Sequence, residues 1–449
     1  RATRAAGDTG YPFNDELLPM QWHLINRGNL FGEKSIVDAD VQCEEAWKSS
    51  TGDQSIIVAV LDEGVMVEHP DLKNNMWVNE GEVYRSKQDN DGNGYKGDVY
   101  GYNFVFDTGV ISWDDVSDTG HGTHVAGVIA AQNNNGIGIS SIAGGNADIP
   151  GVKIMSCQIF SGNDATSGAI TTSAEAIKYA ADNGAVIIQC SFGSKAGTYT
   201  SDSAYERGSG VQYNAIKYFI ESQNCDAVGG GVVIFAAGND ATAMSGYPGA
   251  YHDYISVTSF SPDYLPAYYT NYGPGCNISA PGGDYKISAD AAKTYAEVLS
   301  TVPSELSEYN GADYGFMQGT SMACPHVSGV AALGLSYALE KGKKFTLDEF
   351  KTMILTSVND METYLDGSKT GLVLADYRKK MGTGSIDAYQ LLMQVEGTPC
   401  LRAKVGTKQL VALTKYFGGS ASNLTYLRVE MTRENMDKLG ITEAPSISY

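Results

Sequence analysis

The sequence predicts an α/β fold in which a parallel β-sheet is covered by helices on both faces. Five short apolar runs rich in Val and Ile have the length and composition of buried parallel strands. Stretches with helical spacing alternate with these runs, and such alternation is typical of a parallel sheet. At 449 residues, the chain is long enough for one large domain and an addition.

The expected elements follow one another along most of the chain. The strands are expected at 55–62, 152–160, 185–192, 231–238 and 254–260. Helices are expected at 124–132, 173–184, 211–222, 321–338, 347–358 and 382–394. Reactive groups in such sheets gather beyond the carboxyl ends of the strands. Asp62 and Asn239 both stand at such an end.

The two ends of the chain differ from its central part. We expect residues 1–30 to form an N-terminal extension that packs on the core, residues 31–395 to form the α/β domain, and residues 396–449 to be a β-rich segment. Alternating apolar patterns at 410–417 and 424–431 indicate a small C-terminal β module. A tail that packs on the domain is the alternative, and both interpretations stay open.

Composition excludes several classes of function. The formal net charge of −21 and the absence of a basic cluster argue against nucleic-acid binding. The longest apolar runs are far shorter than the roughly 20 residues of a membrane span. Seven cysteines without a C-x-x-C pair argue against a zinc ribbon and a small disulfide scaffold. Cys157 and Cys190 lie in apolar runs and are expected to be packed thiols, while a disulfide among the others stays open.

Three polar residues stand in settings that suit a nucleophilic serine. They are Asp62 in AVLDEGV, His121 in DTGHGTHVAG and Ser321 in GTSMACPHVSG. A serine hydroxyl is a good nucleophile only when a base takes its proton. The base works best when a carboxylate fixes its tautomer and stabilises its protonated form. Ser321 lies at the start of an expected helix, where unpaired N–H groups can stabilise an oxyanion. Asn239, at the end of an expected strand, can supply a second donor.

These motifs, in the order Asp, His, Ser, resemble the signatures of the subtilisin-like serine peptidases, or subtilases. The resemblance covers roughly residues 11 to 395. It implies a subtilisin-like fold, a triad of Asp62, His121 and Ser321, and Asn239 as an oxyanion donor. It also implies hydrolysis of peptide bonds in proteins through an acyl-enzyme intermediate. The expected partners are protein or peptide substrates, and the expected state is a monomer.

The resemblance implies a substrate groove as well. Segment 191–193 resembles the family segment that pairs with extended substrate backbone. Gly246 resembles the family position at the floor of the pocket for the side chain before the scissile bond, and an open floor favours a large apolar or aromatic side chain. The loop 161–170 is expected to form the other wall. The expected substrate-binding residues are Ser191, Phe192, Gly193, Ala237, Gly238 and Gly246.

Two acidic loops suggest structural calcium, and no organic cofactor is expected. The segment DNDGNGYKGD (89–98) contains the opening of a calcium loop, although Tyr100 replaces the Glu that would complete an EF-hand. An Asx-rich turn without an ion is the alternative. The expected ligands there are Asp89, Asp91, Asn93 and Asp98.

A second candidate calcium site resembles the stabilising site of the family. It would combine Asp71 with the loop 132–141 that follows the histidine helix. Asn134 is the candidate asparagine ligand, while Asn135 stays open because the loop is about one residue longer than usual. An ion there would stabilise the chain only by preferring the folded state.

One residue departs from the family pattern. Glu63 follows Asp62, where subtilases usually have Ser or Thr. It either raises the basicity of His121 or points into solvent, and we favour solvent. A catalytically impaired binding protein on this scaffold is therefore the alternative function. An α/β-hydrolase esterase is excluded because it requires G-x-S-x-G and a triad histidine after the serine.

The start of the chain bears on its location. It begins at Arg1 and shows no signal-peptide pattern, which we interpret as the result of processing after export or of a trimmed sequence. We therefore expect an exported protein that is extracellular, at the cell surface or periplasmic.

Overall fold

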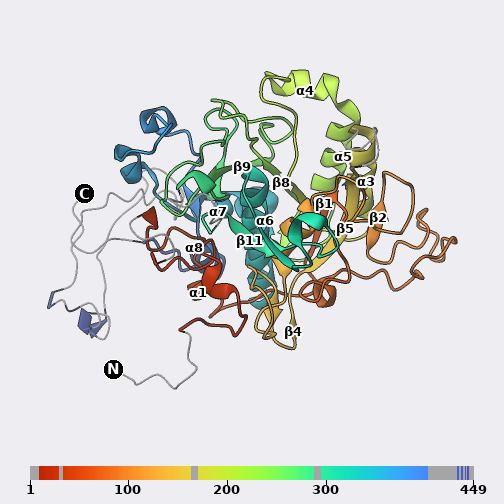
Figure 1. Ribbon diagram of the computed structural model, residues 1–449, viewed down its shortest axis with the longest axis horizontal. Helices are drawn as coiled ribbons and strands as arrows, with labels where there is room; N and C mark the ends of the chain where they lie inside the picture. Colours follow the sequence, from red (N-terminus) through yellow and green to blue (C-terminus); the bar gives the residue numbers. More distant parts are fainter. Residues whose placement is uncertain are drawn as a thin grey trace. The chain divides into compact units, whose positions relative to one another are not determined.

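A computed structural model describes residues 10–29, 34–162, 170–287 and 295–402, with a few residues between 432 and 443. The chain divides into two units, Arg1–Leu401 and Arg402–Tyr449. All elements discussed below belong to the first unit (Figure 1). The strands predicted at 410–417 and 424–431 lie outside the described residues.

A sheet of nine strands forms the centre of the first unit. Its order is β14-β15-β10-β9-β8-β6-β1-β5-β2, and all neighbours are parallel except β14 and β15. The prediction of a parallel sheet is confirmed, and the five predicted strands correspond to β1, β5, β6, β8 and β9. The bounds are β1 (Ile57–Glu63), β2 (Gly101–Asn103), β5 (Lys153–Phe160), β6 (Ile187–Cys190), β8 (Val232–Ala236), β9 (Ile255–Phe260), β10 (Ile278–Pro281), β14 (Val358–Asn359) and β15 (Ser385–Ile386).

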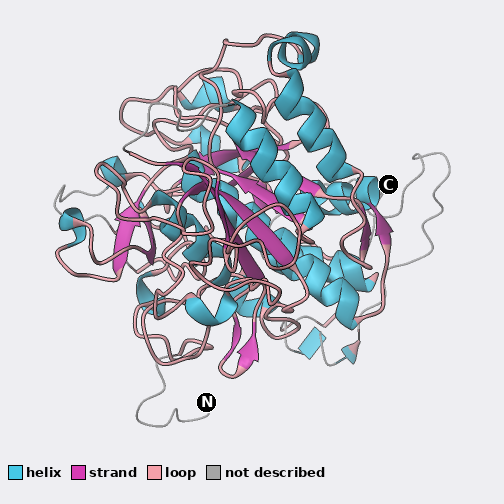
Figure 2. Cartoon of the chain, turned by 90° about the vertical axis from the view of Figure 1, so that its right-hand side faces the viewer, coloured by secondary structure: helices cyan, strands magenta, loops and turns pink. Residues whose placement is uncertain are grey.

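Helices cover both faces of this sheet (Figure 2). Successive side chains of a strand point to opposite faces, so Val58 and Val60 of β1 join one apolar cluster, and Ala59 and Leu61 join another. The first cluster includes residues of α2, α6 and α8, and the second includes residues of α3 and α5. The helix bounds are α2 (His121–Ala130), α3 (Ile170–Asp182), α5 (Gly210–Ile220), α6 (Thr320–Glu340) and α8 (Ala388–Glu396).

Smaller elements complete the first unit. The pairs β11–β12, β7–β13 and β3–β4 form separate two-stranded sheets. The helices are α1 (Cys43–Ala46), α4 (Asp202–Gly208) and α7 (Leu347–Thr356). The strands are β3 (Gly145–Asn146), β4 (Ile149–Pro150), β7 (Val228–Gly229), β11 (Val298–Thr301), β12 (Tyr314–Met317) and β13 (Phe345–Thr346).

The central helix α6 is almost entirely enclosed by the core. It packs against β6, β8, β9 and β10 of the sheet. Among the described residues it is the one helix whose length and composition would suit a membrane span, but 94% of its apolar window is buried inside the protein. Burial in the core therefore accounts for its apolar composition.

The N-terminal segment packs into the same core. Leu18, Trp22 and Leu24 have no exposed surface, and the indole of Trp22 donates to the carbonyl of Glu297 at 2.8 Å. The seven cysteines, all of them described, form no disulfide. Cys157 and Cys190 are buried, as predicted.

The order of strands in the sheet reverses at β1. The strand β5 pairs on one side of β1, and β6 pairs on the other side. In open α/β sheets a crevice forms at the carboxyl ends of the strands at such a point. Three polar residues lie at this edge of the sheet: Asp62 near the end of β1, Ser191 directly after β6, and Asn239 just beyond β8.

Candidate active site

An aspartate and a histidine are paired where β1 meets α2. Nδ1 of His121, the first residue of α2, lies 2.7 Å from Oδ1 of Asp62. Asp62 is only 2% exposed, and the same oxygen accepts the Glu63 backbone N–H at 2.7 Å. A carboxylate on Nδ1 holds a proton on that nitrogen and leaves Nε2 as the acceptor. The structure therefore brings together the two residues that the motifs singled out, Asp62 and His121.

Opposing effects act on the imidazole of His121. Burial lowers the pKa of His121, but the charge and hydrogen bond of Asp62, together with the charge of Glu63, raise this pKa above its usual value. The site therefore favours an imidazole that accepts a proton.

Close packing of α2 on β1 holds this pair in place. A Cβ atom on Gly122 would lie 2.1 Å from the carbonyl oxygen of Glu63, and backbone cannot yield as a flexible side chain can. We expect Gly122→Ala to lower the free energy of unfolding by about 1–3 kcal/mol, measured by urea denaturation. Gly210→Ala is the matched control, because a Cβ there meets nothing within 4 Å. Equal stability of both variants would contradict this account.

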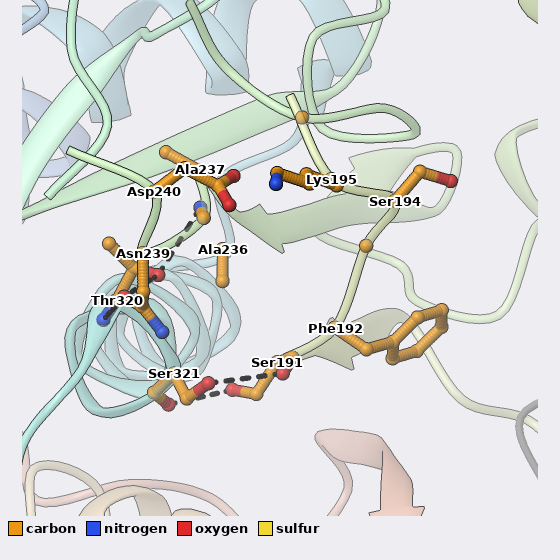
Figure 3. Close-up of a pocket in the computed structure, with 13 residues that line it drawn as sticks. Ser191, Phe192, Ser194, Lys195, Ala236, Ala237, Asn239, Asp240, Thr320 and Ser321 are labelled. Carbon is orange, nitrogen blue, oxygen red and sulfur yellow. Dashed lines mark hydrogen bonds between the residues drawn. The ribbon is translucent and has the colours of Figure 1, made fainter. Parts of the chain in front are cut away.

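Ser321 lies in the first turn of α6. Its hydroxyl donates to the carbonyl of Ser191 at 3.1 Å, and the Ser191 hydroxyl donates to the carbonyl of Ser321 at 2.7 Å (Figure 3). No hydrogen bond joins Ser321 to His121, although the structure describes both residues. The backbone N–H of Ser321 also has no acceptor among the described residues. It is one of the unpaired donors at the start of a helix.

Asn239 is fixed against the same helix start. Its Oδ1 accepts from the backbone N–H of Thr320 at 2.9 Å and from the Thr320 hydroxyl at 2.8 Å. The amide nitrogen is left without an acceptor in the described part of the chain. Figure 3 shows Asn239 beside Thr320 and Ser321 at the edge of a pocket. The position therefore provides a second free donor.

A pocket of about 250 Å³ opens next to Ser321. All six residues predicted to bind substrate line it. Lys195 and Asp240 line it as well, although the sequence analysis did not single them out. The lining residues that bear on the site are Ser191, Phe192, Gly193, Lys195, Ala237, Gly238, Asn239, Asp240, Gly246 and Ser321.

One wall of this pocket is an unpaired stretch of backbone. The strand predicted at 185–192 is shorter in the structure, where β6 ends at Cys190. Within the described residues, the backbone groups of Phe192 and Gly193 have no hydrogen-bond partner, and Ser194 donates to the carbonyl of Tyr247 at 2.7 Å. An extended peptide can bind to such free N–H and C=O groups as an added strand.

A glycine lies in the lining of this pocket. A Cβ on Gly246 would lie 2.4 Å from the carbonyl oxygen of Ser194. Any other residue at this position would therefore push the two pocket walls apart.

A second hollow of about 360 Å³ lies on the other side of Ser191. Of the predicted wall 161–170, the described residues Ser161 and Gly162 line this hollow, and 163–169 lie outside the described residues. Its lining consists of Asp62, Glu63, Thr119, His121, Phe160, Ser161, Gly162, Ser191 and Phe192.

Glu63 faces inward, so the favoured prediction that it points into solvent is wrong. Its carboxylate accepts from the backbone N–H groups of Thr119, at 3.1 Å, and His121, at 3.0 Å. The register of β1 against β5 shifts between Asp62 and Glu63. The partner of Asp62 is Gln158 and that of Glu63 is Phe160, so the extra residue at this shift is Ile159 of β5.

Three carboxylates converge in the first acidic loop. Ligand atoms of Glu82, Asp91 and Asp98 all lie within 4.8 Å of one another. The amide of Asn79 donates to Asp91 at 2.8 Å, and the amide of Asn93 donates to Asp98 at 3.0 Å. Three of the four predicted residues therefore lie together.

Asp89 does not belong to this cluster, which corrects the prediction. Its carboxylate accepts from the backbone N–H groups of Gly92, at 2.7 Å, and Gly94, at 2.9 Å, and so closes the turn. Glu82 takes the remaining place. The local D-x-D-x-N-G spacing could not reveal Glu82, because it lies before the motif.

The second acidic loop is closed by hydrogen-bond donors. Oδ1 of Asp71 accepts from the side-chain amide of Asn135 at 2.7 Å, and Oδ2 accepts from the Ile139 N–H at 3.1 Å. The amide of Asn134 instead donates to Asn146 at 2.9 Å, so Asn135 rather than Asn134 contacts Asp71. Burial raises the pKa of Asp71 to about 7. Calcium binding at this loop stays a prediction, with Asn135 as the asparagine that contacts Asp71.

Comparisons with known proteins agree on one family. The model of the Subtilase family matches residues 53–371. A thermophilic serine proteinase of Bacillus sp. (strain AK1) is 32% identical over 64% of this chain and 54% of its own length. An extracellular basic protease of Dichelobacter nodosus is 28% identical over 81% and 55%, and thermitase of Thermoactinomyces vulgaris is 30% identical over 68% and 82%. The chain spans about half the length of the first two relatives.

Solved structures show the same fold. A protease from Pseudoalteromonas arctica matches with a TM-score of 0.58 and 28% identity, over 85% of this chain and 99% of the other. A lanthipeptide protease matches with a TM-score of 0.54 over 79% and 92%. At 24% identity, this second likeness concerns the fold alone.

Proposed function

The chain belongs to the subtilase family, and from this premise we propose that it is a serine endopeptidase that hydrolyses peptide bonds in proteins. Ser321 is the nucleophile, His121 is the general base, and Asp62 orients the histidine. The observation that carries the proposal is the 2.7 Å contact between Asp62 and His121, in a hollow lined also by Ser191, whose carbonyl accepts from the Ser321 hydroxyl.

Acylation begins when the hydroxyl of Ser321 turns from the carbonyl of Ser191 toward Nε2 of His121. Oγ then attacks the carbonyl carbon of the substrate while His121 takes the hydroxyl proton. His121 returns this proton to the leaving amine as the C–N bond breaks, which leaves an acyl-enzyme. In the second half, His121 takes a proton from water and the hydroxide attacks the ester carbonyl. The bond between the acyl carbon and Ser321 Oγ then breaks, His121 returns the proton to Oγ, and the acid product leaves.

Two free donors stabilise the tetrahedral intermediates. The backbone N–H of Ser321 and the amide nitrogen of Asn239 have no acceptor among the described residues, so both can donate to the oxyanion. Asp62 stabilises the imidazolium that forms at the same time.

The substrate binds as an extended chain. The free backbone groups of Phe192 and Gly193 pair with it, and the side chain before the scissile bond enters the pocket that Gly246 lines. Because glycine adds no side chain to the base, we propose a large apolar or aromatic residue there. An extended substrate segment is available in unfolded or flexible proteins.

A fluorophosphonate probe tests the proposed function. An active enzyme is modified at the Ser321 oxygen, and mass spectrometry of the peptide that contains Ser321 detects the adduct. The alternative, a catalytically impaired binding protein, is not modified. Folded protein that remains unlabelled with calcium supplied would contradict the proposal.

The location follows from the relatives. Three matched relatives are named as extracellular proteases. We propose that this protein is likewise exported.

We propose that calcium binds at Glu82, Asp91 and Asp98. Three carboxylates this close repel one another, and among the described residues no Lys or Arg forms an ion pair with them. Oxygen ligands of this kind suit calcium, and the side-chain amides of Asn79 and Asn93 can rotate to present their oxygens. The ion would neutralise the carboxylates and hold the loop.

Calcium is expected to raise the melting temperature of the protein by about 3 °C relative to chelator, because it binds the folded state only. Scanning calorimetry with calcium and with EDTA measures this difference. Glu82→Gln should lose most of the response, whereas Asp71→Asn should keep it. The opposite result would place the ion in the second loop. A parent protein with the same melting temperature in calcium and in EDTA would contradict calcium binding.

A further inference from the structure

The start of α2 has no capping side chain of its own. Gly120 occupies the N-cap position with φ of 75° and forms no side-chain cap. The first N–H groups of a helix need acceptors from elsewhere, and a serine or aspartate at the N-cap usually supplies one. Glu63 supplies it here from β1, because its Oε2 accepts from the His121 N–H at 3.0 Å.

Glu63 also holds the residues that precede the helix. The same Oε2 accepts from the Thr119 N–H at 3.1 Å and from the Thr119 hydroxyl at 3.2 Å. Thr119 is held from its other side, since its carbonyl accepts from the hydroxyl of Tyr309 at 2.6 Å. The backbone on both sides of Gly120 is therefore fixed by one carboxylate. A negative charge at this end of a helix is also favourable toward the helix dipole.

We propose that Glu63 is a positioning residue for His121: it fixes the start of α2 so that the imidazole stays on Asp62, and its charge sets the lower end of the pH range in which the histidine acts as a base. This inference rests on the proposed function. The residues that usually follow the aspartate in this family, Ser and Thr, carry no such charge.

The charges around this position support a specific electrostatic effect. Burial raises the pKa of Glu63, and the charge of Asp62 adds to this, while His121 and the backbone N–H groups of Thr119 and His121 lower it. Asp62 and Glu63 are the two carboxylates that raise the pKa of His121. Their joint effect is to favour the imidazolium.

Two other titratable groups near this position, His124 and Tyr309, are uncharged. Burial lowers the pKa of His124, one turn along α2, to about 3. Burial and the neighbouring Glu308 raise the pKa of Tyr309, so its hydroxyl stays protonated. Asp118 is a further carboxyl group in this region, and it accepts from the N–H groups of Gly162 and Asp115.

The sign of the effect follows from the role of His121. The imidazole must be neutral to take the serine proton, so a carboxylate that favours the imidazolium moves the acid limb of kcat/KM to higher pH. Removing the charge of Glu63 should move this limb to lower pH. A shift of about half a pH unit is expected for one partly buried neighbouring charge.

Glu63→Gln separates charge from hydrogen bonding. Its amide oxygen can still accept from Thr119 and His121, so kcat/KM on the plateau should stay within about threefold of the parent while the acid limb shifts. Glu63→Ala removes the acceptor too and should also lower the plateau, by about tenfold. Glu68→Gln is the matched control, since Glu68 follows the same strand, is exposed and has no hydrogen-bond partner among the described residues.

A titration of His121 by NMR gives a readout that does not require activity. In the Ser321→Ala background, Glu63→Gln should lower the pKa of His121 by the same amount as it shifts the limb. An unchanged limb and an unchanged titration in Glu63→Gln would overturn the inference, as would an equal shift in Glu68→Gln. A parent that neither cleaves peptides nor labels at Ser321 would contradict the proposed function instead, and the titration would still test Glu63.

Discussion

Ser321→Ala is expected to reduce kcat/KM for peptide hydrolysis by about 10⁴-fold or more, with no loss of stability. Other members of this family show effects on this scale when the nucleophile is removed, because the residual rate comes from the oxyanion donors and substrate binding alone. Alanine is smaller than serine and favours helix, so the first turn of α6 should persist. Hydrolysis of a fluorogenic peptide, followed beside thermal unfolding, measures both quantities.

Ser328→Ala provides the control for this experiment. Ser328 lies in the same helix and is buried, but its hydroxyl donates to the side chain of Gln189 rather than facing the pocket. Its loss should lower stability by about 1 kcal/mol and leave the chemistry intact. Comparable activity of Ser321→Ala and the parent would mean that another group attacks the substrate.

Asn239→Leu is expected to lower kcat by about 10²–10³-fold, a scale that also comes from another member of this family, with a smaller effect on KM. The amide nitrogen is proposed to donate to the oxyanion, which exists only in the transition state and the intermediates, so its loss should act on kcat. Steady-state kinetics over a range of substrate concentrations separate the two parameters.

The side-chain oxygen of Asn239 also contacts Thr320, and a second variant is needed to separate this contact from oxyanion binding. Because this oxygen, Oδ1, accepts from Thr320, Asn239→Leu also removes a support of the helix start. Asn239→Asp keeps an acceptor for Thr320 and removes the donor, and it should lose as much kcat as the leucine variant. If the aspartate variant retained activity, the residue would act through Thr320 and not as an oxyanion donor.

The strands and the reactive residues could be predicted because their signals are local. Buried parallel strands require runs of Val and Ile, which mark β1, β5 and β8 directly. Asp62, His121 and Ser321 each lie within a short motif, and the pairing of Asp62 with His121 follows from the place of each at the end of its element. Tertiary structure was not needed to find them.

Other features depend on contacts that the sequence does not encode locally. Glu63 accepts from the N–H groups of Thr119 and His121, which lie 56 and 58 residues further along the chain, so the pattern of β1 alone does not place its side chain. Glu82 reaches Asp91 and Asp98 through the folding of the intervening loop. Asp89 fits the ligand spacing, yet the N–H groups of its own turn occupy it. Spacing alone cannot rank such competing partners.

The nucleophile and the walls of the pocket come from different kinds of structure. Ser321 belongs to a helix enclosed by the core, whereas Lys195, Asp240 and Gly246 belong to connecting segments beyond the ends of strands. Exchanges at Lys195 or Asp240 disturb few buried contacts, because both side chains are exposed. Selectivity for different peptides can therefore diverge during evolution at little cost to folding. The nucleophile, in contrast, lies on a helix whose residues must also pack in the core.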